Sequence, residues 1–328
     1  MISLREPPSI LSGIAVRLVT GVLTLFFVSI VVFSAMSLLP GDFATSVLGQ
    51  SASPETVLAF RQELGLDQPA VTRYFDWLGG ILHGDFGTSF AGRVAAPRSV
   101  ADIILPRLAN TLMLAGIVGL IAVPLAISCG VAAALYRNSA LDRVLNGIGL
   151  TVVAFPEFFL AYILIFIFSV HLHLLPSLST IKTYYNTLEI ASRLALPVLT
   201  LVLVISAHMM RMTRAAIIGV LASPYIEMAR LKGVKPRDVI VRHALPNAWA
   251  PIVNVVAFNL AYLVVGVVVV EVVFVYPGIG QAMVDAVRLR DMPVVQACTM
   301  IFAGTYIALN MFADLVSVLT NPRLRYPQ

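Results

Sequence analysis

The chain has 328 residues, of which 59% are hydrophobic and only 12% are charged. An average soluble domain is about one-quarter charged, so a soluble globular fold could not bury this much apolar surface. The net charge of +5 does not indicate nucleic-acid binding, because Lys and Arg are scattered between apolar runs and do not gather with aromatic residues on a polar domain. The composition therefore predicts that the lipid bilayer is the solvent for most of the chain.

Six long apolar runs predict six membrane-spanning helices. A helix needs roughly 20 residues to cross a hydrocarbon core of about 30 Å, and these runs reach that length. The first run is too long for the core of a signal peptide, so we expect it to remain attached as a transmembrane helix. The runs cover about residues 14–39, 108–136, 145–172, 194–214, 250–274 and 294–320.

The distribution of Lys and Arg predicts the orientation in the membrane. With six spans, both ends of the chain lie on the same side. The two ends and the loops at 137–144 and 211–249 carry many more basic than acidic residues, whereas the opposite side is nearly balanced. By the positive-inside rule, we expect both termini in the cytoplasm.

A polar insertion between the first two spans, residues 40–106, is expected to be helical and periplasmic. Ser53 is a candidate N-cap for a helix over residues 54–65. A second amphipathic helix is expected over residues 69–82, followed by a break at the glycines of residues 84–87. The insertion therefore predicts a small helical cap over the outer mouth of the protein.

The sequence between the fourth and fifth spans predicts a helix, a turn and a second helix outside the membrane. Ser223 is the expected N-cap of the first helix, Gly233 its end, and residues 236–246 the second helix, which Pro246 stops. A mixed apolar and basic face is expected on the first helix, and it includes Tyr225, Met228, Ala229 and Leu231. Such a face suits docking into a groove on a partner protein, and the alternative is a helix that rests on anionic head groups.

This loop resembles the Glu-Ala-Ala loop of binding-protein-dependent ABC importer permeases. Glu227, Ala229, Gly233 and the pair Leu245-Pro246 match its order, whereas Met228 and His243 depart from the general form. In that family the loop is the coupling helix that inserts into an ATPase subunit. The resemblance thus implies a coupling role for Tyr225, Glu227, Met228, Ala229, Lys232, Gly233, His243, Leu245 and Pro246.

Further segments resemble the dipeptide, oligopeptide and nickel branch of these permeases. A histidine at the position of His243 in the loop also resembles the form that this branch has. They are residues 38–42, 61–69, 84–90, 271–280, 290–293 and 321–326. The resemblance implies an all-α integral membrane fold in which one N-terminal helix packs beside a five-helix type I importer core. The expected parts are the first segment and span (1–39), the cap (40–106) and the transporter domain (107–328), with the coupling loop at 211–249.

The resemblance also implies a function and a set of partners. The chain is expected to be the permease subunit that forms a pathway for di- and oligopeptides across the bacterial inner membrane. Nickel chelates, glutathione and oligosaccharides are alternative cargoes. The expected partners are a second homologous permease in a heterodimer, two cytoplasmic ATPases, and a periplasmic or lipid-anchored substrate-binding protein.

Nucleotide chemistry is expected to reside in those partners. The sequence contains no Gly-x-x-x-x-Gly-Lys-Ser/Thr phosphate-binding loop, no convincing nucleophile and base pair, and no convincing set of metal ligands. We therefore expect a transporter subunit that is not an enzyme, has no cofactor or metal of its own, and relies on ATP and Mg²⁺ bound by the ATPases.

Ionisable residues inside spans are candidate functional residues, because a charge in lipid costs several kcal/mol. Glu157 is expected near the middle of the third span, where it and Phe158 would face a translocation cavity and meet a peptide amino group; the alternative is a structural carboxylate bound by a neighbouring helix. A proton- or sodium-driven transporter would need further buried acids, and only Glu157 fits. Candidates for an outer gate or a binding-protein contact are Asp85, Glu271, Pro277, Gly278, Arg290 and Asp291, with a structural or gating role favoured for Glu271.

Overall fold

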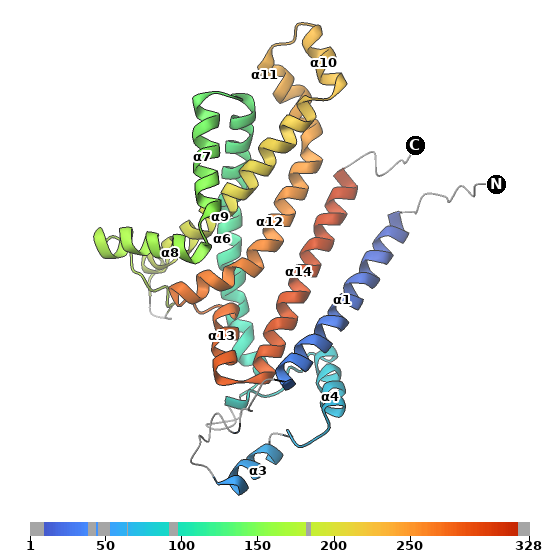
Figure 1. Ribbon diagram of the computed structural model, residues 1–328, viewed down its shortest axis with the longest axis vertical. Coiled ribbons are helices and arrows are strands. Elements are labelled where there is room, and N and C mark those ends of the chain that lie inside the picture. Colours follow the sequence, from blue (N-terminus) through green and yellow to red (C-terminus); the bar gives the residue numbers. More distant parts are fainter. Residues whose placement is uncertain are drawn as a thin grey trace, which may run out of the picture.

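A computed structural model describes residues 10–38, 44, 53–63, 65–91, 98–181 and 185–320. Within these ranges every regular element is a helix, apart from an isolated β-bridge between Thr88 and Ser99. The parts of the 38–42 and 321–326 motifs after residues 38 and 320 lie outside the described residues. Figure 1 shows an elongated bundle with α10 and α11 at one end and α3 and α4 at the other.

The helices follow one another in this order: α1 (Ile10–Leu38), α3 (Pro54–Glu63), α4 (Ala70–Leu82), α6 (Val100–Leu135), α7 (Ala140–Ala154), α8 (Glu157–Leu164), the π-helical segment η1 (Ile165–His171), α9 (Thr187–Leu221), α10 (Pro224–Leu231), α11 (Pro236–Asp238), the π-helical segment η2 (Val239–Ala244), α12 (Leu245–Phe274), α13 (Ile279–Leu289) and α14 (Met292–Thr320). Several helices extend beyond the apolar runs that predicted them. The reason is that a helix continues into polar sequence until a cap or a turn ends it.

Among the described residues, five helical stretches are long and apolar enough to cross a membrane, and two bent pairs raise the count to seven at most. They lie in α1, α6, α9, α14 and the segment from η2 into α12. The predicted third span is wrong as one straight helix, because α7 and the α8–η1 segment meet at 105°. Pro156 lacks an N–H and disfavours helical geometry at the residue before it, and Phe155 is indeed extended, with φ −90° and ψ 139°.

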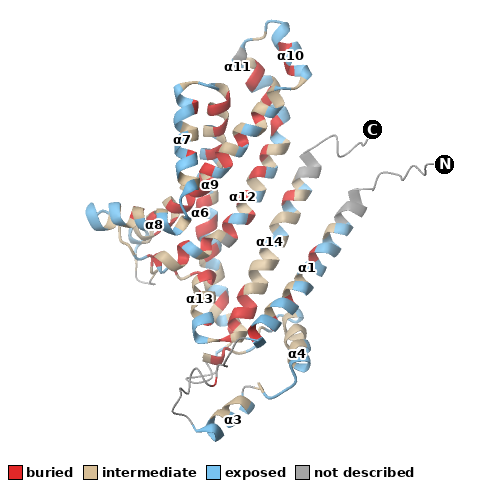
Figure 2. Ribbon diagram, in the orientation of Figure 1, coloured by how far each residue is buried: buried red, intermediate tan, exposed pale blue. Residues whose placement is uncertain are grey.

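The core lies where α6, α9 and α12 pack together, and Figure 2 shows buried residues concentrated along these helices while α1 is mostly exposed. Gly130 of α6 permits a close approach between α6 and α9. A Cβ atom there would lie 2.8 Å from Thr213 Cβ and 2.9 Å from the Met210 carbonyl oxygen. Small residues at helix contacts serve this purpose in membrane proteins.

A partly buried ion pair that the sequence analysis did not single out joins α7 to α9. Arg214 donates from Nε to Asp142 Oδ1 at 2.7 Å and from Nη2 to Asp142 Oδ2 at 2.8 Å. Asn146 Nδ2 and the Asn138 backbone N–H also donate to this carboxylate, which is 4% exposed as a residue. The bidentate geometry and the extra donors offset the cost of removing both charges from water.

The helices expected in the 40–106 insertion are confirmed. Ser53 Oγ accepts a hydrogen bond from the Thr56 N–H at 3.2 Å, and Gly65 follows α3 with φ +67°. α4 packs on α1, where the rings of Phe33 and Tyr74 are 5.3 Å apart in an edge-to-face contact. α6 already begins at Val100, so the insertion is shorter than expected.

Candidate functional site

The break between α7 and α8 opens into a cavity of about 450 Å³ among α7, α8, α9 and α12. Glu157 lies in the first turn of α8, and not in the middle of a continuous span as expected. Tyr262 donates its hydroxyl to Glu157 Oε1 at 3.1 Å. The cavity is lined by Val152, Val153, Phe155, Pro156, Glu157, Phe158, Val204, His208, Tyr262, Gly266 and Val269.

The cavity combines one carboxylate with mostly apolar walls. Phe158 lies on its wall, together with Phe155, which stacks on Phe159 at 5.3 Å. Sequence reasoning missed His208 and Tyr262, although His208 is an ionisable residue inside a predicted span and the rule applied to Glu157 would have found it. A pocket of this composition can hold a cationic group against Glu157 and apolar groups against the rings.

The 223–246 region forms the expected helix and turn at the far end of the bundle from α3 and α4 (Figure 1). Gly233 ends the first helix with φ +77°, a conformation that favours glycine. Ser223 is at the N-cap position, but its hydroxyl donates back to the Val220 carbonyl and caps nothing in α10. Pro246 does not stop the second helix: η2 continues directly into α12, and Pro246 lies in the first turn of α12, where its missing N–H costs little.

The exposed face of α10 differs from the expected one. Ala229 is 9% exposed and lies on the buried side with Ile226, which packs against Val239 and Ala244 of η2. Ala229 therefore gives close packing within this chain and not an open surface. The exposed residues of the region include Tyr225, Glu227, Met228, Leu231, Lys232 and Gly233, with His243 and Leu245 partly covered and Pro246 exposed.

Glu271 is fully buried and links α12, α13 and α6. Its carboxylate accepts hydrogen bonds from Thr111 Oγ1 at 2.6 Å and from the backbone N–H groups of Gly280 at 2.7 Å and Gln281 at 3.2 Å. Those amides belong to the first turn of α13, whose positive dipole end favours a carboxylate. A Cβ atom on Gly278 would lie 2.0 Å from Glu271 Oε1, so only glycine fits there.

Pro277 takes part in the same connection. Its carbonyl oxygen accepts a hydrogen bond from Asn110 Nδ2 at 2.9 Å, and Tyr276 donates its hydroxyl to the Asn110 carbonyl at 2.8 Å. The 271–280 motif thus fixes the turn between α12 and α13 against α6. Glu271 is 0% exposed, so its side chain offers no surface to a partner, and the structural or gating role favoured from sequence stays a prediction.

Asp291 brings together two motifs that are far apart in the sequence. Its carboxylate accepts hydrogen bonds from Ser89 Oγ, from the Phe90 N–H at 3.1 Å and from the Ala91 N–H at 3.2 Å. Arg290 before it has φ +57° and turns the chain from α13 into α14. Asp85 remains exposed and accepts from the Gly87 N–H at 2.8 Å, which shapes the 84–90 loop.

These features define a class. Long apolar helices with a bent pair, a cavity between them and a helix-turn-helix region at one end are the features of a multi-span membrane protein. The fold resembles a chain of the MetNI methionine ABC transporter in inward-facing conformations, with a TM-score of 0.51 and 16% identity over 67% of this chain and 96% of that one.

Sequence comparison gives the family. Residues 122–326 match the family of binding-protein-dependent transport system inner membrane components, and residues 10–115 match its N-terminal region. The chain is 37% identical to a peptide transport system permease protein of Brucella abortus (strain 2308), over 94% of this chain and 98% of that one. It is 36% identical to the glutathione transport permease GsiC of Escherichia coli (strain K12), over 94% and 97%. The chain therefore belongs to this family and is a multi-pass permease subunit of an ABC importer.

Proposed function

We propose that this permease subunit forms a pathway for di- and oligopeptides across the bacterial inner membrane. The observation that carries the proposal is the cavity beside the α7–α8 break, where the Glu157 carboxylate is held by Tyr262 among aromatic and aliphatic walls. Glu157 attracts the free ammonium of a peptide, while the apolar walls accept side chains of varied shape. The relative from Brucella abortus is named for peptide transport.

The proposed topology counts six spans with both termini in the cytoplasm. The bent pair of α7 with α8 and η1 counts as one span, beside α1, α6, α9, α12 and α14. This count places the basic 223–246 region in the cytoplasm, as the positive-inside rule requires, and it places α3 and α4 in the periplasm.

The proposed partners follow from the division of labour in an ABC importer. A second homologous permease completes the pathway, two cytoplasmic ATPases bind ATP and Mg²⁺, and a binding protein delivers the peptide. The exposed surface of α10, formed by Tyr225, Met228 and Leu231, contacts the ATPase. Coupling requires that these contacts differ between the two states of the transporter, because equal contacts would shift no equilibrium.

The test is to isolate the chain with its partners from native membranes in mild detergent and to reconstitute the complex in liposomes. We expect a second permease, the ATPases and a binding protein to co-purify, and uptake of peptides to require ATP. Uptake by this chain alone on an ion gradient would overturn the proposal.

Glutathione is a second candidate cargo, because a relative of nearly equal identity is a glutathione permease. Competition between unlabelled ligands for uptake distinguishes a peptide cargo from a glutathione cargo. Excess glutathione that abolishes uptake of a labelled tripeptide, while unlabelled dipeptides do not, would assign glutathione as the cargo.

A further inference from the structure

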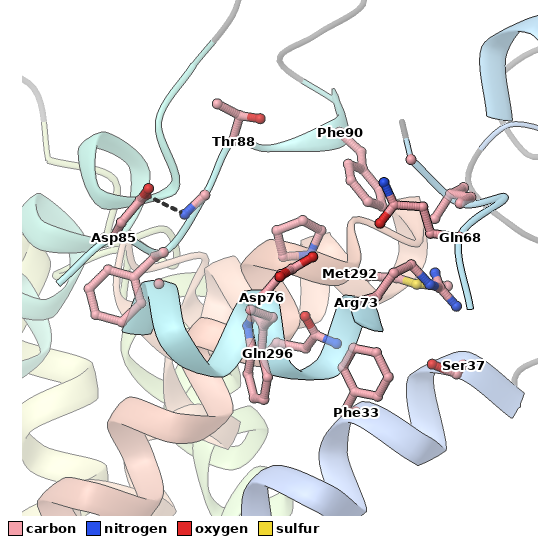
Figure 3. A pocket seen from close by; sticks show the side chains of 17 residues that line it. Phe33, Ser37, Gln68, Arg73, Asp76, Asp85, Thr88, Phe90, Met292 and Gln296 are labelled. Carbon is pink, nitrogen blue, oxygen red and sulfur yellow. Dashed lines mark hydrogen bonds between the residues drawn. The ribbon is translucent and has the colours of Figure 1, made fainter. Parts of the chain in front are cut away.

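A second cavity, of about 340 Å³, lies at the α3–α4 end of the bundle between α1, α4, the 84–90 loop and the start of α14. Figure 3 shows side chains from these elements converging on it. It is separate from the cavity around Glu157 and shares no residue with it. Its walls are Phe33, Ser37, Gly65, Leu66, Gln68, Arg73, Asp76, Trp77, Gly80, Asp85, Phe86, Gly87, Thr88, Phe90, Met292, Pro293 and Gln296.

Two residues that line this cavity carry a buried hydrogen-bond donor that has no partner in the described part of the chain. The donors are Arg73 Nε and Trp77 Nε1, which lie one helical turn apart on α4. A buried donor without an acceptor costs about 1–3 kcal/mol, more where the group is charged. Arg73 contacts the Phe33 ring, with its guanidinium carbon 5.9 Å from the ring centroid, and this contact provides no acceptor oxygen. Both donors therefore lack an acceptor within the described part of the chain, and an anion is the acceptor that a charged guanidinium favours.

A carboxylate on the same helix adds the opposite charge. Asp76 lies three residues after Arg73, lines the same cavity and is exposed. Asp85, the other acid in the wall, already accepts a hydrogen bond from the Gly87 N–H. The cavity therefore offers donors for an anion and, close by, a carboxylate for a cation.

An apolar groove of about 310 Å³ adjoins the cavity and shares Phe33 with it. It lies between α1 and α4 and is lined by Ile30, Phe33, Ser34, Ala70, Val71 and Tyr74. α1 is a candidate span of which only 11% is buried within the chain. The groove is thus continuous with the exposed apolar surface of a candidate membrane span.

α4 has the properties of a helix at the membrane interface. Its inner side places Tyr74 and Trp77 against Phe33 of α1. Val71, Phe75 and Leu82 are exposed and are spaced by four and seven residues, so they form one apolar stripe that begins at the edge of the groove, where Val71 lies. Tyr and Trp are enriched where a membrane meets water, and such a stripe inserts among lipid head groups.

We propose that α1 and α4 hold one phospholipid of the outer leaflet with an ethanolamine head group. The phosphate accepts hydrogen bonds from Arg73 Nε and Trp77 Nε1, the ammonium lies toward Asp76, and an acyl chain occupies the groove beside Val71. The combination of an anion site, a carboxylate and an adjoining apolar groove matches a zwitterionic lipid better than a soluble anion. The proposal rests on membrane placement and is independent of the cargo.

The test uses the full-length chain with its co-purifying subunits, stripped of lipid in detergent and titrated with short-chain phosphatidylethanolamine by native mass spectrometry. We expect one tight site per chain. Trp77→Phe removes only the N–H donor, and Arg73→Met removes the charge and keeps an apolar side chain. Each is expected to weaken binding about tenfold or more, the value of one hydrogen bond to a charged group. Arg288→Met, an exposed cation on α13 outside the cavity, is the matched control and leaves binding unchanged.

Three further measurements separate the alternatives. Asp76→Asn should reduce the preference for phosphatidylethanolamine over phosphatidylglycerol, because it removes the partner of the ammonium. Inorganic phosphate that displaces the lipid at equal concentration would show a free-anion site and overturn the proposal. Unchanged lipid binding in Trp77→Phe and Arg73→Met would overturn it as well, and lost docking of the binding protein in those same variants would assign the cavity to a protein contact. The thermal stability of each variant without lipid controls for misfolding.

Discussion

Glu157 is the residue on which the proposed cargo depends, because it supplies the carboxylate of the cavity around the α7–α8 break. Its hydrogen bond from Tyr262 orients the carboxylate but leaves acceptor capacity for a ligand. A structural carboxylate in this position would act equally on every cargo, whereas a substrate contact would discriminate by the charge of the ligand. The two roles therefore differ in a measurable way.

We expect Glu157→Gln to reduce ATP-dependent uptake of peptides with a free amino terminus by about tenfold or more, since a hydrogen bond to a charged group contributes about 1.5–3 kcal/mol. Uptake of the same peptides with an acetylated amino terminus should change little. The measurement is competition between the two peptide forms in liposomes. Glu55→Gln on exposed α3 is the control, and equal losses for both peptide forms would assign Glu157 a structural role.

Substitution of Gly278 should have a clear effect on stability, because a Cβ atom at this position would overlap the buried Glu271 carboxylate. Gly278→Ala should lower stability by about 1–3 kcal/mol or more, as overpacking does, and should lower the thermal midpoint in detergent. Gly304→Ala in α14 is the matched control, because a Cβ atom there meets nothing within 4 Å. A Gly278→Ala protein with the stability of the parent would contradict the described role of Glu271.

At the scale of elements, the ion pair between Asp142 and Arg214 joins the start of α7 to α9. Asp142→Asn should destabilise the protein by about 1–3 kcal/mol, because it leaves the partly buried Arg214 guanidinium, whose side chain is 24% exposed, without a counter-charge. Arg214→Gln combined with Asp142→Asn should cost less than the sum of the single changes. Thermal denaturation in detergent measures both effects.

The exposed pair of Arg242 and Asp238, at 3.6 Å, is the internal comparison for the partly buried pair. Asp238→Asn should cost less than about 1 kcal/mol. If Asp142→Asn and Asp238→Asn lowered the free energy of unfolding by similar amounts, partial burial of the α7–α9 pair would add nothing to its contribution to stability.

Substitutions on the two sides of α10 should have different effects on the subunit. Met228→Glu changes an exposed side chain, so we expect a folded subunit that retains the ATPases poorly and transports little. Ala229→Glu places a charge on the buried side, so we expect loss of folded protein. Co-purification of the ATPases, measured beside the yield of folded subunit, separates the two. Full ATP-dependent uptake by Met228→Glu would exclude the exposed side of α10 from coupling.

The helices were largely predictable from sequence, and the bends were less so. Long apolar runs and the caps at Ser53 and Gly65 gave the helices, because these signals are local. The bend at Pro156 had a local signal, the proline itself, but the long apolar run around it favoured one continuous span. The inward position of Ala229 had no such signal, because it depends on how η2 packs against α10. The continuation of η2 into α12 through Pro246 was missed as well, because a proline in the first turn of a helix looks like the end of the helix before it.

At the scale of the whole molecule, the contacts that fix the architecture join distant segments. The motifs at 84–90, 271–280 and 290–293 were recognisable from sequence, but their physical reason was not. The structure shows it: Asp291 accepts hydrogen bonds from the Ser89 hydroxyl and from the backbone N–H groups of residues 90 and 91. Glu271 accepts them from Thr111 and from the start of α13. One sequence contains no direct record of such pairings.

The orientation in the membrane can be tested by labelling. With Cys129 and Cys298 replaced, Lys232→Cys should react with an impermeant maleimide only after the membrane is opened, whereas Arg288→Cys should react in intact spheroplasts. The expectation follows from the opposite ends of the bundle at which α10 and α13 lie (Figure 1) and from the positive-inside rule. Reaction of both sites, or of neither, in intact spheroplasts would contradict the proposed topology.

The contact between Ser89 and Asp291 spans 202 residues of sequence, and this sets an order of assembly. During synthesis at about 5–20 residues per second, the 84–90 loop emerges about 10–40 seconds before the carboxylate that will bind it. Throughout that interval the loop lacks its anchor, and native pairing must wait until the last helix is being made. A chain that ends before Asp291 can therefore insert its early helices but cannot make the hydrogen bonds that hold residues 89–91.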